Sequence, residues 1–480
     1  MSLSRRSFLG AAAASSAFGL FTISGTKASG RVLGANDTVR VGVAGINGRG
    51  TSHIEGFVGQ KNVQVAYLID PDTRLFESRS KMVTDKGQPK PTCVPDIRKA
   101  LEDKSLDAVS VATCNHWHSL ITVWACQAEK DVYVEKPISH NVFEGRKCVE
   151  AAKKYNRVVQ HGTQRRSSQG DANTVSAVRS GNYGKLLVAK GYCCKPRWSI
   201  GTKPAGTAPS GLDFDIWLGP ASQQPYHSNL VHYNWHWFWE TGNGDIGNQG
   251  VHEMDVARWG IADATLPSKV WSIGGRFVPG EKDQGETPNM LLSVMEFGEA
   301  LLVFETRGLV GKDNAPKPRV ENEFYTTEGV IRGGKFYPKK GGEAVSVKGT
   351  GDIKVASGGP FGSFINAVRS RKMNEVNCDA EVAHYSAALC HLANISYRLG
   401  KTGAFDPKVK VIGDNKQVVE SFEALESNLH GLKLNVDSPQ YHVGRELQFD
   451  PKTEKFTGDD EANALLTRPY RAPYVVPEKV

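Results

Sequence analysis

The stretch that decides the fold is Val41-Gly-Val-Ala-Gly45-Ile-Asn-Gly48-Arg-Gly50, an apolar strand that runs into a glycine-rich turn. Such a turn lets backbone amides approach a pyrophosphate at the N-terminus of the following helix. Asp70 ends the next apolar run, about 20 residues after Gly50, where a carboxylate accepts hydrogen bonds from the ribose hydroxyls of adenosine. Strand, turn, helix and acid together predict a dinucleotide-binding domain rather than a turn with only a structural role.

The turn departs from the usual fingerprint because Asn47 stands where the second glycine is expected. Asparagine tolerates unusual backbone angles better than most residues, but its side chain narrows the space for phosphate. Asp70 disfavours a 2′-phosphate and so favours NAD over NADP, whereas Arg74, one helical turn further on, could reverse that choice. The cofactor ligands predicted from this region are Gly45, Asn47, Gly48, Arg49, Gly50 and Asp70.

Around this turn the chain alternates between apolar strands and helix-like runs as far as Gln164. Near-continuous apolar strands separated by helices indicate a parallel sheet that is covered on both faces. The expected strands begin at Thr38 and continue at 62–70, 106–113, 131–135 and 157–160, and the expected helices span 118–129 and 143–155.

Past Gln164 the pattern changes to β-rich runs, three of which follow one another without a helix between them. This indicates a second, largely antiparallel sheet. Two helices close the region, and the remaining chain is polar and ends in a stretch punctuated by proline. The β-rich runs span 185–194, 269–277, 289–297 and 300–306, and the helices 361–371 and 379–399.

The sequence therefore predicts an α/β protein with a dinucleotide-binding domain at 37–164 and an α+β domain with a largely antiparallel open sheet at 165–400. Residues 401–480 are expected to wrap a domain or a neighbouring subunit as a C-terminal extension. The composition, with 23% charged and 39% apolar residues among 480, is that of a globular protein. The net charge of +8 comes without a long basic run, so we expect no nucleic-acid partner.

Cysteine and histidine usage gives no sign of a metal site. The eight cysteines are scattered without CxxC spacing, which favours buried free thiols. His232 and His236 are spaced as zinc ligands on a helix can be, but no HExxH motif or partner cysteine supports them, so we predict no metal. Both belong to the aromatic run 232–239, which could form a platform for a sugar ring or pack between sheet and helix.

The N-terminus reads Ser4-Arg5-Arg6-Ser7-Phe8-Leu9-Gly10 and continues as a weakly apolar stretch to about Ile23. It resembles a twin-arginine export signal. Serines and glycines interrupt the stretch, whereas a membrane-spanning helix needs about 20 strongly apolar residues, so we expect no stable membrane anchor. We predict a signal at 1–28, a linker at 29–36, the twin-arginine translocon as a partner and a periplasmic location.

Two further motifs lie where strands of the first sheet would end. Thr113, Asn115 and His118 form a T-x-N-x-x-H pattern, and Glu135-Lys136-Pro137 follows the next strand. With the glycine turn, these residues make the chain resemble the Gfo/Idh/MocA oxidoreductases, a family that acts mainly on sugars and cyclitols. Cys114 stands where that family has proline. The resemblance covers the first two predicted domains and implies that the first is a Rossmann domain that binds NAD.

By this resemblance Thr113, Asn115, His118, Glu135 and Lys136 would contact the cofactor. Lys136 would also lie beside the substrate hydroxyl, where an ammonium group stabilises an alkoxide as hydride leaves its carbon. Glu135 would orient Lys136 or the cofactor rather than react. Two alternatives stay open: Lys136 as a solvated loop residue, and His118 as a packing residue at the start of a helix.

The second domain contains Asp245-Ile-Gly-Asn248-Gln-Gly250-Val-His252-Glu-Met-Asp255, which resembles the family's D-x-G-x-H-x-x-D element. Asn248 stands in the place of the first acid, and an amide cannot accept a proton. We therefore predict that His252 is the general base and contacts substrate, while Asn248 positions substrate, unless Asp245 has taken the acid's role. The alternative for His252 is that it caps or packs a helix.

The predicted function is NAD(P)-dependent hydride transfer at a secondary hydroxyl of a carbohydrate: a sugar, a glycoside or a cyclitol. Gln164 and Arg165, which follow the last strand of the first sheet, are further predicted substrate ligands, with surface solvation as the alternative. We expect a homo-oligomer that keeps its cofactor bound, because the periplasm offers no free nicotinamide pool. Two other functions remain: a redox-neutral glycoside hydrolase acting through a transient 3-keto sugar, which Lys136 disfavours, and a non-catalytic sugar- or nucleotide-binding protein.

Overall fold

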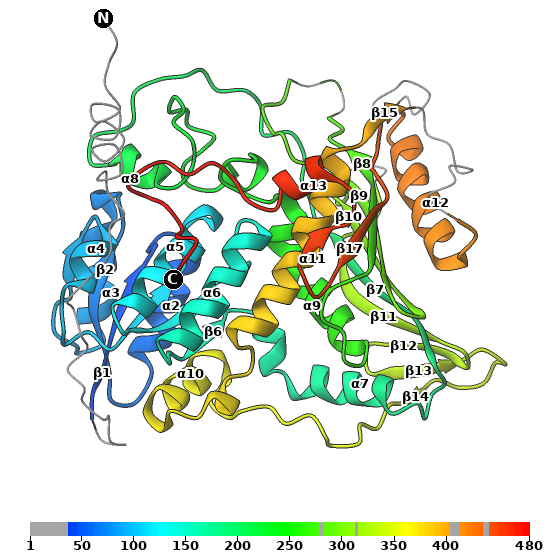
Figure 1. Ribbon diagram of the computed structural model, residues 1–480, viewed down its shortest axis with the longest axis horizontal. Coiled ribbons are helices and arrows are strands. Elements are labelled where there is room, and N and C mark those ends of the chain that lie inside the picture. Colours follow the sequence, from blue (N-terminus) through cyan, green and yellow to red (C-terminus); the bar gives the residue numbers. More distant parts are fainter. Residues whose placement is uncertain (1–36, 279, 281, 313–314, 404–412, 435–440) are drawn as a thin grey trace, which may run out of the picture.

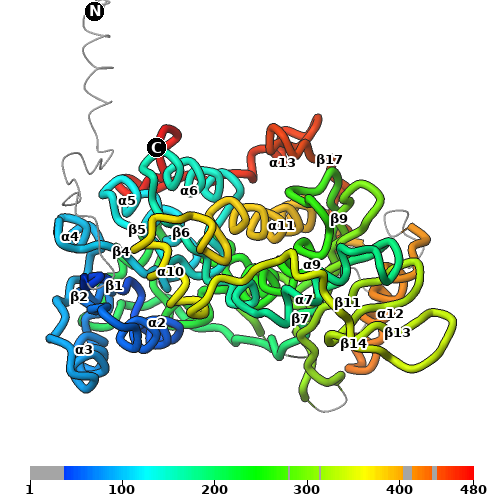
Figure 2. Tube along the Cα trace, turned by 90° about the horizontal axis from the view of Figure 1, so that it is seen from below, coloured from blue at the N-terminus to red at the C-terminus, as the bar shows by residue number. Residues whose placement is uncertain are grey.

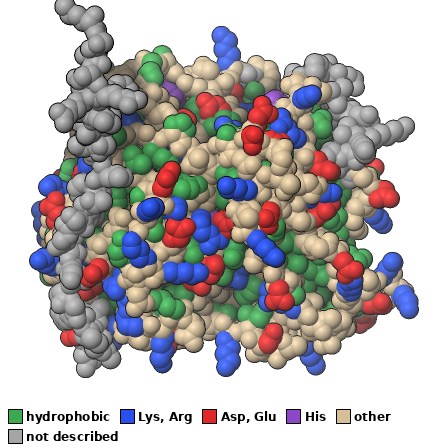
Figure 3. Space-filling model, in the orientation of Figure 1, with side chains coloured by type: hydrophobic (Ala, Val, Ile, Leu, Met, Phe, Trp, Pro, Cys, Tyr) green, Lys and Arg blue, Asp and Glu red, His purple; other side chains and the backbone are tan. Residues whose placement is uncertain are grey.

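The computed structural model describes residues 37–278, 280, 282–312, 315–403, 413–434 and 441–480. The predicted export signal and linker lie outside the described residues. Within the described part, no helix is long and apolar enough to cross a bilayer. All eight cysteines are free thiols. On the face shown in Figure 3, the side chains of Lys and Arg are interspersed with those of Asp and Glu.

The first unit is built on a parallel sheet of six strands in the order β3-β2-β1-β4-β5-β6. The order reverses between β1 and β4, which opens a crevice at the carboxyl ends of these strands. β3 is the one strand of this sheet that the sequence did not predict, because three residues carry too little pattern. The strands are β1 (Val39–Ala44), β2 (Val63–Ile69), β3 (Thr92–Val94), β4 (Ala108–Val111), β5 (Asp131–Val134) and β6 (Val159–His161).

Helices cover both faces of this sheet, as expected for strands that are apolar on both sides (Figure 1). One face packs against α4 (Ile97–Leu101), α5 (Asn115–Gln127) and α6 (Val142–Lys154). The opposite face packs against α2 (Arg49–Val58), α3 (Phe76–Thr84) and α10 (Gly359–Ser370). Because α5 begins earlier than predicted, Asn115 and His118 of the T-x-N-x-x-H motif occupy its first turn, and Thr113 lies just before the helix.

The second unit is a mixed sheet with 12 strands among the described residues. Its strands β7 and β10 pair in parallel and the other pairs are antiparallel, so the sheet is largely antiparallel, as predicted. The main path runs β14-β13-β12-β11-β7-β10-β9-β8-β16-β15. The strands are β7 (Leu186–Cys194), β8 (Lys269–Gly275), β9 (Met290–Phe297), β10 (Ala300–Arg307), β11 (Arg319–Thr326), β12 (Gly329–Arg332), β13 (Lys335–Pro338), β14 (Val345–Ser346), β15 (Lys401–Gly403), β16 (Tyr441–Val443), β17 (Leu447–Asp450) and β18 (Lys455–Phe456).

The long helix α11 (Ala380–Arg398) joins the two units (Figure 2). Ala383 and Ala387 are buried in the core of the first unit, whereas Leu389 and Leu392 are buried in the core of the second. Shared burial of one helix couples the two units mechanically. α7 (Gln169–Arg179) and α9 (Val251–Gly260) pack on the same face of the second sheet, and α12 (Lys416–Gly431) covers its other face.

The C-terminal extension does more than wrap the surface. Its strands β16 and β17 both pair with β8 and so enlarge the second sheet. The short helix α13 (Asp460–Ala464) follows, and the chain then returns to the first unit, where Tyr474 and Val476 are buried in the core (red in Figure 1). The extension therefore ties the far edge of the second sheet to the first unit.

Candidate active site

A cavity of about 290 Å³ lies where the first sheet reverses its strand order. Its floor is formed by residues that follow β1, β2, β4 and β5, and its roof by residues of the second unit. All the predicted cofactor ligands except Gly50 line it. They are Gly45, Asn47, Gly48, Arg49, Asp70, Thr113, Asn115, His118, Glu135 and Lys136.

The glycine turn leaves room for a pyrophosphate. Gly45 has a φ of 78°, and a Cβ there would lie 2.5 Å from the backbone nitrogen of Thr113. A Cβ on Gly48 would meet no atom within 4 Å, so the turn is open at that point, directly before α2. Gly50 serves packing instead, since its Cβ would lie 1.9 Å from the Gly45 carbonyl oxygen. The turn therefore fits the phosphates of NAD at a helix N-terminus.

Asp70 follows β2, faces the cavity and is almost fully buried. Its Oδ1 accepts a hydrogen bond from the Asp72 backbone nitrogen at 2.9 Å, and burial raises the pKa of the carboxyl group. Arg74 does not line the cavity, because its Nε and Nη2 donate to Asp72 at 2.7 and 2.6 Å. Arg74, which could have bound the 2′-phosphate of NADP, is thus paired with Asp72. Asp70 therefore favours NAD over NADP.

The first turn of α5 braces the loops around the cavity. Asn115 Nδ2 donates to Asn243 Oδ1 at 3.0 Å, which links the two units. The two ring nitrogens of His118 lie 2.6 Å from the Pro137 carbonyl oxygen and 2.9 Å from that of Thr113. Although Asn115 and His118 line the cavity as predicted ligands, their polar groups hold protein segments in place. For His118 these two bonds favour the packing alternative, and its role as a cofactor ligand stays a prediction.

Glu135 is the centre of a buried polar network. Its Oε1 accepts hydrogen bonds from Arg49 Nε at 2.7 Å, Gln164 Nε2 at 3.1 Å and His53 Nε2 at 3.2 Å. Burial alone would raise the pKa of Glu135, but the bond from His53 and the charges of Arg49 and Lys136 hold it well below its usual range. Gln164, predicted to bind substrate, is therefore a partner of Glu135 and does not line the cavity.

Lys136 and Asn248 bring the two units together at the floor of the cavity. Lys136 Nζ donates to the Asn248 carbonyl oxygen at 2.7 Å, and the Asn248 Oδ1 lies at 3.4 Å. Lys136 follows β5, whereas Asn248 lies in the π-helical turn Ile246–Gly250 that leads into α9. Burial lowers the pKa of Lys136. Two of the residues predicted to act in catalysis are thus in contact, and both face the cavity.

Asp245 and His252 do not line this cavity. Asp245 is buried with its Oδ1 2.8 Å from Arg197 Nε, and its Oδ2 accepts a hydrogen bond from Cys193 at 3.1 Å. Asp245 is thus an ion-pair partner of Arg197, and its role in place of the missing acid stays a prediction. His252 keeps a part of its surface exposed. The burial of the rest, together with the charge of Lys136, lowers the pKa of its ring to about 3, so the ring is neutral at pH 7.

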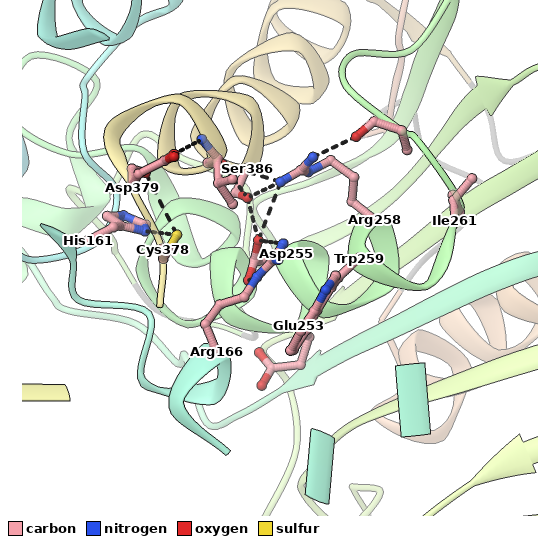
Figure 4. A network of polar contacts seen from close by, with 12 residues as sticks. His161, Arg166, Glu253, Asp255, Arg258, Trp259, Ile261, Cys378, Asp379 and Ser386 are labelled. Atoms are coloured by element: carbon pink, nitrogen blue, oxygen red, sulfur yellow. Dashed lines mark hydrogen bonds and ion pairs between the residues drawn. The ribbon is translucent and has the colours of Figure 1, made fainter. Parts of the chain in front are cut away.

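Asp255, the last residue of the second-domain motif, lies in α9 and belongs to a polar network with Arg166 and with Ser386 of α11 (Figure 4). Its two carboxylate oxygens accept hydrogen bonds from Arg166 at 2.8 Å each, and Ser386 of α11 donates to the same group. These groups hold the pKa of Asp255 well below its usual range. Arg165, predicted to bind substrate, instead donates to Asp171 at 2.6 Å and lies outside the cavity lining.

The roof of the cavity comes from a segment whose residues the sequence did not assign individually. The bond between His232 Nε2 and Asp72 Oδ2, at 2.9 Å, fastens this segment to the end of β2. A β-bridge between Asp72 and Leu212 adds a second attachment. The aromatic run was the only signal in the sequence, and its spacing indicated no fixed partner. The roof residues are Ile216, Trp217, His232, Tyr233, Trp235 and His236.

The described residues contain no cluster of three or more side chains able to hold a metal.

Comparison with known proteins bears on both units. Residues 39–163 match the NAD-binding Rossmann fold of the Gfo/Idh/MocA oxidoreductase family, and residues 183–273 match the family's C-terminal α/β domain. A glycosyl hydrolase family 109 protein of Shewanella pealeana is 26% identical over 220 residues, which is 42% of this chain and 48% of the relative. A myo-inositol 2-dehydrogenase of Thermotoga maritima is 29% identical over 154 residues, 32% of this chain and 44% of the relative. The chain spans about half the length of the curated relatives it matches.

Solved structures share the fold at low identity. An aldose-aldose oxidoreductase from Caulobacter crescentus superposes with a TM-score of 0.54 at 14% identity, over 73% of this chain and 94% of that one. A levoglucosan dehydrogenase in complex with NADH and levoglucosan gives 0.52 at 17% identity, over 74% and 95%. With both family domains matched in order, and with the glycine turn and the Glu135-Lys136-Pro137 segment at one cavity, the chain belongs to the Gfo/Idh/MocA family of oxidoreductases.

Proposed function

We propose that the protein is an NAD-dependent oxidoreductase that acts on a secondary hydroxyl of a sugar, a glycoside or a cyclitol. The observation that carries this proposal is the position of Lys136, whose ammonium group faces the same cavity as the glycine turn and Asp70. Relatives named as a myo-inositol dehydrogenase and a levoglucosan dehydrogenase support the substrate class.

The residues of this chain divide the work between binding and proton handling. Gly45, Gly48 and Asp70 would hold NAD, which takes up the hydride when it is bound. Lys136 would donate a hydrogen bond to the substrate oxygen and stabilise the alkoxide that forms there, and this effect is strong in a site shielded from water. His252 does not line the cavity and is neutral at pH 7, so it would accept the hydroxyl proton through one bridging water. Asn248 positions the ammonium group through its carbonyl oxygen.

A second candidate is the redox-neutral hydrolysis of a glycoside through a transient 3-keto sugar. It is favoured by the relatives named as glycosyl hydrolase family 109 proteins. Lys136 favours the oxidoreductase, because the NAD-dependent glycosidases differ from the E-K-P pattern at this lysine. A non-catalytic binding protein would need neither Lys136 nor His252.

The test is single-turnover reduction of bound NAD by a panel of hexoses, pyranosides and cyclitols, followed by the absorbance of the reduced nicotinamide. We expect at least one polyol to reduce the cofactor. No reduction by any member of the panel, together with no NAD released on denaturation and none bound on titration, would contradict the proposal. Glycoside cleavage with deuterium from solvent at C2, and no net cofactor reduction, would favour the hydrolase.

We further propose that the protein reaches the periplasm by the twin-arginine route with its cofactor bound. The support is the Arg5-Arg6 signal, together with the roofed cavity, which suits retention of a nucleotide through export. The double variant Arg5→Lys, Arg6→Lys should stay in the cytoplasm of the native host. Periplasmic accumulation equal to that of wild type would contradict the assignment.

A further inference from the structure

His236 faces the cavity that holds Lys136, but no motif of the sequence assigned it a role. It lies in the short helical turn Asn234–Trp237 of the roof and is 9% exposed. Its ring stacks on Trp235 with ring centroids 3.5 Å apart and an interplanar angle of 19°. A buried ring stacked in this way keeps a fixed orientation.

The hydrogen bond on the other edge of the ring fixes its tautomer. His236 Nδ1 lies 2.5 Å from the Tyr233 carbonyl oxygen. Since a carbonyl oxygen can only accept, Nδ1 carries the hydrogen. Burial, with the positive charge of Lys136, lowers the pKa of the ring to about 3, so His236 is neutral at pH 7. Nε2 then has a lone pair and no hydrogen, and no described residue donates to it.

Lys136 and His236 therefore offer opposite halves of a hydrogen-bonding pattern. The ammonium group of Lys136 has only donors, and Nε2 of His236 is only an acceptor. A hydroxyl group carries one donor and two lone pairs, so a substrate with several hydroxyls can satisfy both residues, through one hydroxyl or through two. A carboxylate or phosphate oxygen has no hydrogen to give to Nε2. The cavity is thus suited to a neutral, hydroxylated ring at this position.

We propose that His236 is a specificity residue whose Nε2 accepts a hydrogen bond from a substrate hydroxyl, so that the site selects a hydroxylated ring over its deoxy and carboxylated counterparts. The inference rests on the proposed oxidoreductase function and deepens it. It gives His236 a contact with substrate that differs from the proton transfer assigned to His252.

The first test compares kcat/KM for an active sugar and its monodeoxy analogues. In wild type, the analogue that lacks the hydroxyl facing His236 should lose about 10- to 100-fold, because the bound analogue shields Nε2 from water and leaves it unpaired. His236→Phe keeps a ring against Trp235 but removes the acceptor, so the penalty for that one analogue should disappear. His236→Gln offers an oxygen near the same place and should restore part of the discrimination.

His430→Gln, an exposed histidine on α12, is the matched control and should behave as wild type. Unchanged discrimination among all the analogues in His236→Phe would overturn the proposal. Wild-type protein that turns over no sugar would overturn the function on which it rests.

A second measurement needs no turnover. In nitrogen-15 NMR of histidine-labelled protein, the His236 signals are assigned by their loss in His236→Gln. We expect an unprotonated Nε2 at pH 7 that shifts when the active sugar is added and not when the critical deoxy analogue is added. A protonated Nε2 at pH 7, or no shift with the active sugar, would overturn the proposal even if the enzyme is active.

Discussion

Asp70 is hydrogen-bonded to Ile46 of the glycine-rich turn, because its Oδ2 accepts a hydrogen bond from the Ile46 backbone nitrogen at 2.9 Å. The same carboxylate faces the cavity where the sequence predicts a ribose ligand. The Asp70 side chain thus holds the glycine-rich turn in place and also faces the position predicted for the ribose. A change at this position should disturb both ends of the adenosine diphosphate site.

Replacing Asp70 should weaken NAD binding and relax the discrimination against NADP. Asp70→Asn keeps an acceptor but loses the charge, and we expect an affinity loss of about 10-fold or more. Asp70→Ala should lose more, because the Ile46 amide also loses its partner. Fluorescence titration with NAD and NADP measures both effects. Asp85→Asn, which alters an exposed ion pair with Lys81, is the control. Unchanged affinity for both cofactors would show that Asp70 is not the ribose ligand.

Lys136→Ala should slow the reduction of bound NAD by sugar about 10²- to 10⁴-fold, the range typical of a positioned acid or base. NAD itself should still bind, because the glycine turn and Asp70 are untouched. Lys195→Ala is the matched control, since Lys195 Nζ contacts Gln249 at 3.0 Å next to the site without lining the cavity. Single-turnover absorbance separates chemistry from product release. A wild-type rate in Lys136→Ala would rule out the proposed role.

The pH dependence of the reduction rate should follow the charge of Lys136. Burial lowers the pKa of this lysine from 10.5, so the ammonium form, and with it the rate, should be lost as pH rises through a value below 10.5. His252 has a pKa of about 3 and stays neutral above that, so we expect no loss of rate between pH 7 and 5. A fall in rate centred near pH 6.5 would instead indicate a histidine with an ordinary pKa.

His252→Ala should also slow single-turnover reduction, whereas Asp245→Asn should act mainly on stability. Asp245 is buried against Arg197, and removal of its charge leaves the guanidinium without its partner. We therefore expect Asp245→Asn to unfold at lower denaturant concentration and to keep most of its rate per folded molecule. If Asp245→Asn instead abolishes the reaction in fully folded protein and His252→Ala does not, Asp245 is the base.

The parts of the site that the sequence predicted are those set by short-range chemistry. The glycine turn, Asp70 and Lys136 each follow a strand, and parallel strands bring their carboxyl ends to one edge of the sheet. The sequence did not reveal that Gln164 and Arg165 pair with Glu135 and Asp171, because spacing alone does not show such partners. Their roles as substrate ligands stay predictions.

Long-range packing explains the remaining differences. His236 became a candidate only when the fold placed it in the lining of the cavity that Lys136 also lines, since nothing in an aromatic run tells which ring nitrogen is free. The strands β16 and β17 were missed because each is short and pairs with β8, far away in the sequence. The polar composition of residues 401–480 therefore predicted an extension, whereas part of this segment belongs to the second sheet.

The extension should depend on Glu454 for its attachment to both units. This residue follows β17 and accepts hydrogen bonds from His384 Nε2 of α11, at 3.0 Å, and from Arg146 of α6. Burial alone would raise the pKa of Glu454, but these two partners lower it to about 2. A carboxylate whose pKa is lower in the folded than in the unfolded chain stabilises the fold above the unfolded value near 4.5, and this contribution is lost as pH falls toward 2.

Glu454→Gln should therefore lower the free energy of unfolding at pH 7 by about 2 kcal/mol, less than for a fully buried pair because Glu454 is partly exposed. Urea denaturation at pH 7 and at pH 3 measures the effect, and the difference from wild type should shrink at pH 3, where the wild-type carboxylate has lost most of its advantage. Glu461→Gln, which removes an exposed partner of Arg445, should change the free energy by less than about 0.5 kcal/mol. An equal loss for Glu454→Gln at both pH values would mean that shape, and not charge, fastens the extension.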